Sequence, residues 1–595
     1  MGCWCLLVGM GGDTDTVKAV AAALTHSGAL RRERIDAGLT LLTSGTVALR
    51  SLGEGILLGH LFTSLGDPVP DTASWSSDDD GSAFVRRHWG AYVAVRRSTD
   101  GIELLRDPSG MAPCYLARAG SVWLITDAPR LIFEQGVLTP SFDWRIVAAS
   151  LVSRDWRGEP TALAGLEEVL PGTAVSLGTR GAVRHRVWDA CRFVRPASGQ
   201  DLSAEALAET IDRSMAAWAR VYRRPLIEIS GGLDSAIVAA ALARRAEAPH
   251  LITFAAGPGD PTELGYAQAI AGELGLPLEI AHPQIEQVDL TRSHACDLPR
   301  PNARAFTQAA DALSRAHAGA VGADAFASGG GGDDLFGYRQ AIAPAIDRLW
   351  SEGPRFAVIR TLDDIARVSH ATVWEALIRF VRRIVARRSV LADRVDTRLL
   401  APEARELAAI PTGVQAPGFR KMPGKAAHLR AIATLPNHLE GHGRASFAPV
   451  LFPLLSQPVV EFCLAVPSWR WSEGGQNRAL ARHAFADRLP ACVIERRSKG
   501  AFDGFCARLF DRNRALVGEL LLEGALAGHG ILDRAAVEAA IRNPAPSGEL
   551  VMRLLGLVDV EAWLRSWSEM PATAPRVHAN GHIAPASPAP DPRVG

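Results

Sequence analysis

The chain contains 595 residues, 48% of them hydrophobic and 22% charged, a globular composition in a chain too long for one ordinary hydrophobic core. Because 64 Lys and Arg residues balance 64 Asp and Glu residues, no net field attracts a nucleic acid or an anionic membrane, and we expect neither as a partner. Prolines interrupt the apolar stretch between Arg444 and Glu461, so no membrane-spanning helix is expected. The eight cysteines form no Cys-x-x-Cys pair, which predicts reduced thiols and a cytoplasmic location.

Residues 1–190 contain short apolar runs separated by turn residues, a pattern typical of a sheet-rich domain. The expected strands lie at 40–42, 55–58, 91–95, 102–105 and 122–125.

After the Pro-Ala-Ser-Gly sequence at 196–199, long helical periods alternate with short strands. The expected strands are 225–229, 251–255, 278–281 and 325–328, and the helices between them include 235–245, 262–274 and 303–316. This alternation predicts a second domain over residues 200–567, of the α/β class, with a doubly wound parallel sheet and added helices.

A long helix is also expected over residues 374–398, where apolar side chains lie beside Arg379, Arg382, Arg383, Arg387 and Arg388. The pattern fits a surface helix with a solvated basic face, and it also fits a docking surface for an acidic peptide or partner. Residues 571–595 are rich in Pro, Ala and His without periodicity, which predicts a disordered tail.

The strongest chemical signal is Ser230-Gly231-Gly232-Leu233-Asp234-Ser235, between a predicted strand and an Ala-rich helix. The glycines allow a tight turn whose amide N–H groups face a phosphate, and the hydroxyl groups of Ser230 and Ser235 add hydrogen bonds. Asp234 is unsuited to contact phosphate directly, so we assign it to Mg2+. The absence of Gly-Lys-Ser/Thr argues against γ-phosphoryl transfer and favours cleavage of ATP between its α and β phosphates.

A second glycine loop, Ser328-Gly329-Gly330, continues through two further glycines to Asp333. By itself, such a run also fits a flexible linker. It follows another predicted parallel strand, however, and ligands of open α/β sheets bind at the carboxyl ends of the strands. We therefore expect Asp333 to share the Mg2+ with Asp234, and the glycine backbone to approach the nucleotide.

Together the two loops resemble the PP-loop ATP pyrophosphatase domain of the asparagine synthetase family. Segments 106–113 and 449–462 and the sequence Arg496-Arg497-Ser498-Lys499-Gly500 are similar to further family motifs, so the resemblance covers nearly the whole chain. It implies an N-terminal glutaminase-like domain with an Ntn-type αββα sandwich and a C-terminal domain like the adenine nucleotide α-hydrolases. It also implies ATP and Mg2+ as cofactors and a catalytic Lys499, whose charge favours the departure of pyrophosphate.

The chain departs from the glutamine-dependent members of that family. Those members use a cysteine exposed by removal of the initial Met, whereas here Gly2 follows Met1 and the backbone nitrogen of Cys3 is acylated. Gly59 and His60 stand where the family's glutamine-binding Asn-Gly-Glu is expected. We therefore expect a first domain that has lost its glutaminase reaction, and a nucleophilic amine that belongs to the substrate.

Among such members, the chain most resembles lasso-peptide cyclases, because Gly330 replaces a tyrosine of the β-lactam synthetases and segment 452–458 is similar to the cyclases. The resemblance implies adenylation of an Asp or Glu side chain of a precursor peptide, which is then joined to the peptide's own N-terminal amine. A leader peptidase and a leader-recognition protein would be further partners. Asparagine synthetase, a β-lactam-synthetase-like amidoligase and a nonenzymatic binding scaffold are the alternatives. Candidates for a general base lie in one loop: His438, Glu440 and His442.

Overall fold

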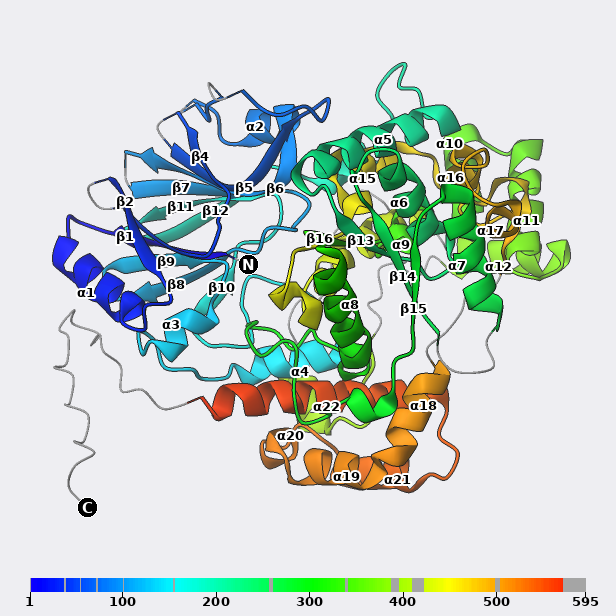
Figure 1. The fold of residues 1–595 in the computed structure, drawn as a ribbon. Helices are drawn as coiled ribbons and strands as arrows, with labels where there is room; N and C mark the ends of the chain where they lie inside the picture. The colour runs from blue at the N-terminus through cyan, green and yellow to red at the C-terminus, as the bar shows by residue number, and fades with distance from the viewer. Residues whose placement is uncertain are drawn as a thin grey trace.

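The structure, a computed structural model, describes residues 2–36, 39–53, 55–70, 73–76, 78–99, 101–153, 156–255, 261–337, 341–386, 395–408, 422–497 and 503–570. A strand-rich N-terminal part lies beside a helix-rich part that surrounds a parallel sheet (Figure 1). Within these ranges, no helix is long and apolar enough to cross a lipid bilayer. The predicted tail, 571–595, lies outside the described residues.

The N-terminal part is a sandwich of two six-stranded antiparallel sheets, and its strands include all those expected from the sequence. The first sheet has the order β10-β8-β9-β1-β3-β2 and the second the order β12-β11-β7-β6-β5-β4. The first consists of β1 (Cys3–Gly9), β2 (Arg31–Asp36), β3 (Leu39–Ser44), β8 (Tyr115–Ala119), β9 (Val122–Thr126) and β10 (Leu166–Glu168). The second consists of β4 (Leu49–Leu52), β5 (Gly55–Thr63), β6 (His88–Ser98), β7 (Gly101–Arg106), β11 (Thr173–Gly178) and β12 (Gly181–Arg186).

Helices cover the outer face of each sheet. Helices α1 (Thr14–Thr25), α3 (Arg130–Glu134) and α4 (Trp144–Val152) pack on the first sheet, and α2 (Ser82–Arg87) packs on the second. Strand β1 is apolar at consecutive positions because both of its faces are covered: Leu6 packs between the sheets, whereas Leu7 packs beneath the helices. The predicted αββα sandwich is therefore confirmed.

The second part contains a five-stranded parallel sheet with the order β15-β14-β13-β16-β17. Its strands are β13 (Pro225–Glu228), β14 (His250–Phe254), β15 (Leu278–Ala281), β16 (Ala325–Ser328) and β17 (Val450–Leu451). Helices α5 (Ala204–Val221), α6 (Leu233–Ala243) and α7 (Pro261–Leu274) pack in one hydrophobic cluster, and α8 (Gln308–Val321) contributes to the cluster on the other face. This arrangement confirms the predicted doubly wound parallel sheet.

Two predicted helices have other bounds in the structure: α8 runs over Gln308–Val321 instead of 303–316, and the helix expected over 374–398 does not include 395–398. Helix α8 begins at Gln308 instead of 303, since the N–H of Ala305 donates to the Asp559 carboxylate (2.8 Å) instead of joining a regular helix. The helix expected over 374–398 is α12 (Val373–Ala386). Residues 395–398 are not helical, because the N–H of Asp396 donates to the carbonyl of Val152 (2.9 Å). Arg387 and Arg388 lie outside the described residues.

Further helices surround the parallel sheet and extend beneath the sandwich. The α-helices are α9 (Gly332–Leu335), α10 (Ala343–Glu352), α11 (Phe356–Val368), α13 (Pro402–Leu407), α14 (Pro423–Thr434), α15 (Gln457–Ala465), α16 (Ala479–Ala484), α17 (Ala491–Glu495), α18 (Asp503–Arg512), α19 (Arg514–Glu523), α20 (Ala525–Gly528), α21 (Arg534–Arg542) and α22 (Gly548–Ser568). The 3-10 helices are η1 (Ala190–Phe193), η2 (Ile285–Gln287), η3 (Ala305–Thr307), η4 (Leu435–His438), η5 (Gly443–Ser446), η6 (Pro453–Leu455) and η7 (Ser468–Gly475).

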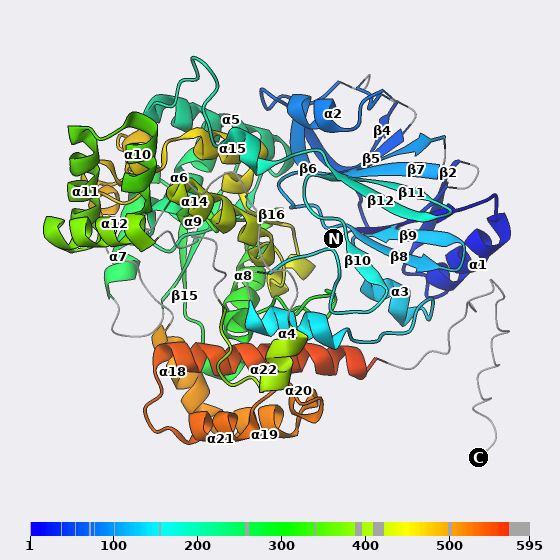
Figure 2. The same ribbon diagram turned by 180° about the vertical axis from the view of Figure 1, so that it is seen from behind.

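Helix α22 runs beneath both parts of the molecule (Figure 2). Its Trp563 lies against Phe142, with ring centroids 5.6 Å apart, and its Trp567 lies against Phe133 at 5.3 Å. One hydrophobic cluster therefore contains residues from both sides of the boundary expected between 190 and 200. The two parts share a core, and the boundary itself stays a prediction.

A buried cluster of charges also joins the two parts. Glu168, at the end of β10, is fully buried and accepts hydrogen bonds from three guanidinium groups. Its Oε1 lies 2.7 Å from both Arg106 and Arg157, and its Oε2 lies 3.1 Å from Arg300 of the second part. Arg157 also contacts Glu440 of the second part at 2.6 Å. A charged group buried this deeply is stable only with such partners.

The ionisation of Glu168 depends on its burial and on the neighbouring guanidinium groups. Burial opposes the charged form, but the guanidinium groups of Arg157, Arg300 and Arg106 outweigh it and hold the pKa of Glu168 well below its usual range. A carboxylate with a lowered pKa in the folded state contributes stability above its unfolded pKa of about 4.3. That stability is lost as the pH falls towards the folded pKa.

Glu168→Gln should therefore lower the free energy of unfolding by about 3–5 kcal/mol near pH 7, because it leaves buried arginines without their carboxylate. Urea unfolding of both proteins measures this difference, which should shrink as the pH falls below about 4. Glu167→Gln is the matched control on the same strand. Its partially exposed side chain contacts Arg184 at the surface, and its loss should cost no more than about 1 kcal/mol. Equal urea midpoints for Glu168→Gln and the wild type would contradict the role of the cluster.

Candidate active site

The first glycine loop leaves the carboxyl end of β13 and leads directly into α6. Ser235 closes the loop, since its hydroxyl accepts a hydrogen bond from the N–H of Ser230 (3.2 Å) and donates to the carbonyl of Gly232 (3.2 Å). Leu233 is buried in the core beneath, which anchors the first turn of the helix. Asp234 is therefore held at the start of α6, as the sequence predicted.

Gly231 is required by its conformation and by its neighbours. Its φ is +66°, and a β-carbon there would lie 2.7 Å from Cβ of Tyr266. The side chain of Arg496 fixes the same turn, because its Nη1 donates to the Gly231 carbonyl (2.9 Å) and its guanidinium lies 4.2 Å from the ring centroid of Tyr266. Arg496 also contacts Glu263. The first arginine of the predicted basic motif thus supports the glycine loop.

The second glycine loop follows the neighbouring strand β16 and packs tightly against the first. A β-carbon on Gly329 would lie 2.4 Å from the backbone nitrogen of Ser235, and one on Gly330 would lie 2.9 Å from the ring of Phe452. The N–H of Gly330 donates to the hydroxyl of Ser328 (3.2 Å). Protein atoms therefore account for these glycines, and their expected contact with the nucleotide stays a prediction.

The packing of the loops brings the two predicted metal ligands to one cation, the guanidinium of Arg478. Its Nη1 lies 3.0 and 3.1 Å from the two carboxylate oxygens of Asp234 and 2.9 Å from Oδ1 of Asp333. The three side chains are 11%, 13% and 27% exposed in the order Arg478, Asp234 and Asp333. Arg478 has a left-handed backbone, with φ +56°, and lies just before α16.

The donor set of this pair fits Mg2+. Mg2+ is commonly held by one or two carboxylates together with substrate phosphates and water, and the Asp234–Asp333 pair supplies the carboxylates around a single positive charge. In the described part of the chain, no group of three or more His, Cys, Asp or Glu side chains could hold a metal ion by itself. The ion would therefore bind together with the nucleotide. No motif in the sequence pointed to Arg478, which is distant along the chain from both aspartates.

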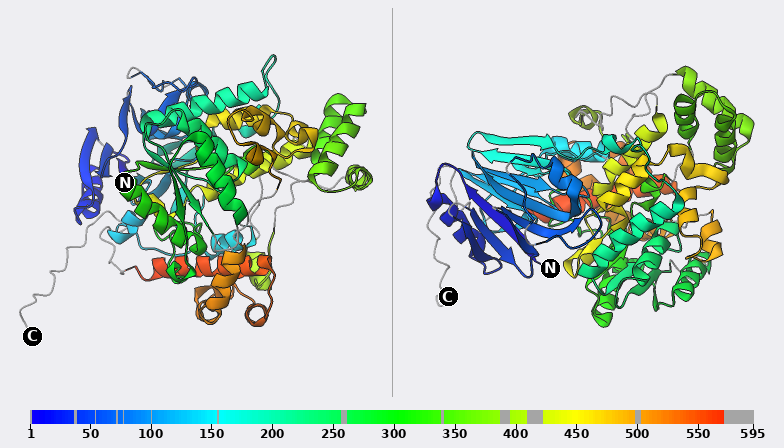
Figure 3. Two further views of the ribbon diagram at one scale, coloured as in Figure 1. Left: turned by 45° about the vertical axis from the view of Figure 1, so that its right-hand side comes forward. Right: turned by 90° about the horizontal axis from the view of Figure 1, so that it is seen from above.

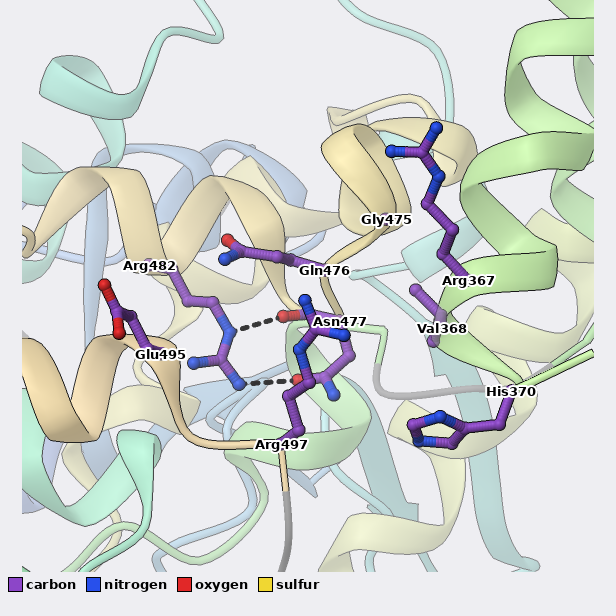
Figure 4. Close-up of a pocket in the computed structure, with 9 residues that line it drawn as sticks. All are labelled: Arg367, Val368, His370, Gly475, Gln476, Asn477, Arg482, Glu495 and Arg497. Atoms are coloured by element: carbon purple, nitrogen blue, oxygen red, sulfur yellow. Dashed lines mark hydrogen bonds between the residues drawn. The ribbon is translucent and has the colours of Figure 1, made fainter.

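A separate pocket lies between α11 and the segment that includes Asn477, the residue before Arg478 (Figure 4). It is lined by Arg367, Val368, His370, Gly475, Gln476, Asn477, Arg482, Glu495 and Arg497. Arg482 donates to the carbonyl of Asn477 (2.7 Å) and to its side-chain oxygen (2.8 Å), so the residue preceding Arg478 is held firmly. Three arginines and one glutamate line the pocket, but the guanidinium of Arg367 contacts Asp363 (2.6 Å) and that of Arg482 donates to backbone carbonyls, so the lining does not by itself define an anion site.

The expected catalytic Lys499, with Ser498 and Gly500, lies outside the described residues. Arg497 lines the pocket described above, and Arg496 donates to the carbonyl of Gly231, so the described part of the basic motif lies against the first glycine loop. The role of Lys499 stays a prediction.

The three candidate bases differ in their surroundings. Glu440 contacts Arg157 and accepts a hydrogen bond from the hydroxyl of Tyr115 (3.0 Å), so it belongs to the charge cluster between the two parts. His442 Nε2 lies 3.1 Å from the carbonyl of His438. Burial and the charge of Arg444 lower the pKa of His442, which favours a neutral imidazole. The contacts of His438, Glu440 and His442 do not identify any of them as the general base.

In the N-terminal part, Cys3 lies in β1 with its Sγ 3.1 Å from the hydroxyl of Ser44. Burial raises the pKa of the Cys3 thiol, which disfavours the nucleophilic thiolate. His60 lies beside α5 of the second part, with Nε2 3.2 Å from the hydroxyl of Tyr222. All eight cysteines of the chain lie among the described residues and are free thiols.

The predicted motif at 106–113 forms a buried turn. Arg106 donates to the carbonyls of Ala112 (2.6 Å) and Gly110 (2.9 Å) as well as to Glu168. The buried carboxylate of Asp107 accepts a hydrogen bond from the N–H of Gly110 (3.0 Å). The motif therefore stabilises the sandwich and its contact with the second part.

Comparisons with known proteins identify the family. A family model described as asparagine synthase matches residues 205–565. Among solved structures, an allosteric regulatory enzyme of purine biosynthesis aligns over 48% of this chain and 82% of its own, with 11% identity and a TM-score of 0.20. Glutamine phosphoribosylpyrophosphate amidotransferase from B. subtilis, complexed with ADP and GMP, aligns over 47% of this chain and 65% of its own, with 11% identity and a TM-score of 0.18. A comparison with curated proteins found no match.

The two structural similarities are too low to carry an inference, whereas the family match spans most of the chain. It includes the parallel sheet, both glycine loops, the Asp234–Asp333 pair and Arg478. The chain therefore belongs to the asparagine synthase family and contains an ATP-dependent, AMP-forming amidoligase domain.

Proposed function

We propose that the protein is a lasso-peptide macrolactam synthetase. It would adenylate an Asp or Glu side chain of a precursor peptide and join it to the N-terminal amine of the same peptide, with release of AMP and pyrophosphate. The observation that carries the adenylation step is the meeting of Asp234 and Asp333 at one cation, at the carboxyl edge of the parallel sheet.

The residues of the site have distinct roles in that reaction. Mg2+, when bound, supplies positive charge that offsets the negative charge of the phosphates. Asp234 and Asp333 hold that ion, and Ser230, Ser235 and the loop amides orient the phosphates. Arg478 contacts both carboxylates and so holds them close to one another. Lys499 is proposed to stabilise the departing pyrophosphate.

Ring closure within one peptide fits a site to which glutamine supplies no ammonia. The partly buried Cys3 thiol, with its raised pKa, is a poor nucleophile for releasing ammonia from glutamine. The acyl-adenylate would then react with an amine already bound at the site. An amine on the same peptide replaces a second encounter by an intramolecular step, which can lower the barrier by up to about 7–11 kcal/mol.

The proposal includes the partners and location expected from the resemblance. A leader peptidase would expose the N-terminal amine, and a leader-recognition protein would present the precursor, both in the cytoplasm. No nucleic acid or membrane takes part. A sharp test combines the purified protein, Mg-ATP, the leader peptidase and a candidate precursor encoded nearby.

Asp234→Asn and Asp333→Asn should each reduce AMP release with that peptide by at least about 100-fold, since loss of metal-mediated charge stabilisation costs several kcal/mol of barrier. Asp324→Asn is the matched control, because this carboxylate lies just before β16 at the opposite edge of the sheet and accepts hydrogen bonds from the N–H groups of Arg223 and Arg224. AMP formation is followed by chromatography. Near wild-type turnover in either site variant would show that the aspartate pair does not hold the metal.

Cys3→Ala should leave AMP and product formation unchanged, because the raised pKa of this partly buried thiol disfavours the thiolate that a glutaminase reaction needs. Glutamine should be neither required nor hydrolysed. Glutamate release from glutamine that is present in the wild type and absent from Cys3→Ala would instead favour an asparagine synthetase.

The product should be a cyclic peptide, lighter than its linear core by one water. Tandem mass spectrometry should show ordinary cleavages in the tail and none within the ring, and AMP should form in equal amount. Linear peptide together with ATP consumption, or transfer of a free amino acid to the peptide, would rule out the cyclase and leave the adenylation site intact.

A further inference from the structure

Exposed apolar side chains are concentrated on helices α10–α12. Among the described residues, eight of the fourteen large apolar side chains that are exposed lie within 350–385, which makes this the main apolar surface. Four of them form a line along α12, called here the α12 column: Trp374 (74%), Ile378 (50%), Val381 (49%) and Val385 (74%). Soluble proteins rarely leave a continuous apolar surface of this kind without a partner.

The spacing of the α12 column is symmetrical. Its members follow one another at intervals of four, three and four residues, which keeps them on one line that reads the same in both directions. Two such lines that run antiparallel meet member to member. Trp374 of one copy lies opposite Val385 of the second copy, and Ile378 lies opposite Val381. A large side chain then faces a smaller one at each end of the contact, which favours close packing.

The two charged side chains beside the column are opposite in sign. At about 100° of rotation per residue, Glu375 and Arg382 lie on the same flank of the column, whereas Arg379 and Arg383 lie on its far side. In an antiparallel pair, this flank meets the same flank of the second copy. Glu375 of each copy then lies within about 3 Å along the helix axis of the other copy's Arg382. A parallel pair would instead place like charges opposite one another, so the charges favour the antiparallel arrangement.

Glu375 and Arg382 are both exposed and can take part in such contacts. Oε2 of Glu375 accepts hydrogen bonds from the N–H (2.8 Å) and the hydroxyl (3.1 Å) of Thr372, which fixes the start of α12. Both of these bonds use Oε2, so they leave Oε1 able to accept from a guanidinium group of a second copy.

The other contacts of α12 leave room for a second copy. Leu377, Phe380 and Ile384 pack against α10 and α11, and this side lies about a quarter turn from the column. Helices α10–α12 protrude on the side away from the N-terminal sandwich in both views of Figure 3. A second α12 can therefore lie along the column without displacing α10, α11 or the sandwich.

We propose that two copies of the protein associate by antiparallel pairing of their α12 helices, with the α12 column as the apolar seam and Glu375 and Arg382 as flanking ion pairs. A contact between two helices of 14 residues should bury about 1,200 Å² or less, the small end of specific interfaces, so the dimer should be reversible. Arg379 and Arg383 would keep the solvated basic face expected from the sequence. The inference does not depend on the proposed cyclase reaction.

Two other occupants fit the column less well. An acidic partner would meet Glu375 as well as Arg382 on the one charged flank, so the charges give it no net advantage. A helix on a membrane surface usually inserts its whole apolar face between lipid headgroups. Part of the apolar surface of α12 is already packed against α10 and α11, so only the column is available.

The test is sedimentation of the full chain over a range of concentrations, which should show a reversible equilibrium between monomer and dimer. Trp374→Gln and Ile378→Gln should each weaken the dimer by at least about tenfold, because each change occurs twice in a symmetrical interface. Arg382→Glu should weaken it by at least about fivefold, since two carboxylates then face one another in both flanking contacts.

Exchange of the two charges gives a sharper result. Glu375→Arg by itself should weaken the dimer, because it places two cations opposite one another and also removes the cap of α12. Glu375→Arg combined with Arg382→Glu restores opposite charges in both contacts, and this double variant should dimerise more tightly than either single variant.

Val183→Gln and Leu65→Gln are the matched controls, because both side chains are exposed apolar residues of the N-terminal sandwich (69% and 63%). They should leave the equilibrium unchanged. Trp374→Gln, Ile378→Gln and Arg382→Glu should keep the wild-type thermal midpoint at concentrations where the protein is monomeric, which separates lost pairing from lost folding.

Three results would overturn the proposal. The first is a protein that is monomeric at every concentration, or a dimer that the α12 variants do not weaken. The second is a dimer that Trp374→Gln weakens but that the charge exchange does not restore, which would exclude the antiparallel pairing. The third is a monomer that binds phosphatidylglycerol vesicles or an acidic amphipathic peptide and loses this binding in Trp374→Gln, which would assign the column to that occupant instead.

Discussion

The contact between two glycine loops at the carboxyl edge of the parallel sheet is the constraint on which the candidate active site depends. Neighbouring parallel strands end about 4.8 Å apart, so loops that leave both of them collide unless one lacks side chains. A β-carbon on Gly332 would lie only 2.5 Å from the β-carbon of Asp234. One on Gly329 would lie equally close to the backbone of Ser235. This approach allows carboxylates from separate strands to share one cation, and the buried side chains of Leu233 and Leu335 beneath the loops hold the arrangement in place.

That meeting could be predicted from the sequence because both loops follow apolar runs of strand length, and parallel strands end at a common edge. The position of Arg478 could not be predicted, since it depends on how η7 and α16 pack against strands far away in the chain. The ends of α8 and α12 were missed for a related reason. Apolar residues continue into 303–307 and 395–398, where tertiary partners such as Asp559 and Val152 accept backbone hydrogen bonds and no regular α-helix forms.

Contacts between the N-terminal sandwich and the second part restrict the orientation of the two parts relative to one another. Glu168 lies among guanidinium groups of both parts, and a small rotation of one part would leave at least one buried charge without a partner. His60 lies against α5 at the same boundary. The turn at 106–113 supports this contact from within the sandwich, so a motif that resembles a family signature is explained here by packing and buried hydrogen bonds.

The shared core beneath α4 has a consequence for the synthesis of the protein. Phe133 and Phe142 emerge from the ribosome early, whereas Trp563 and Trp567, which pack against them, belong to α22, the final helix of the described residues. At a translation rate of about 5–20 residues per second, the nascent chain exposes this apolar surface for roughly 20 seconds or more. The N-terminal part therefore cannot complete its packing before α22 has been synthesised. A chain released before α22 would keep an exposed apolar surface, which favours aggregation or binding by a chaperone.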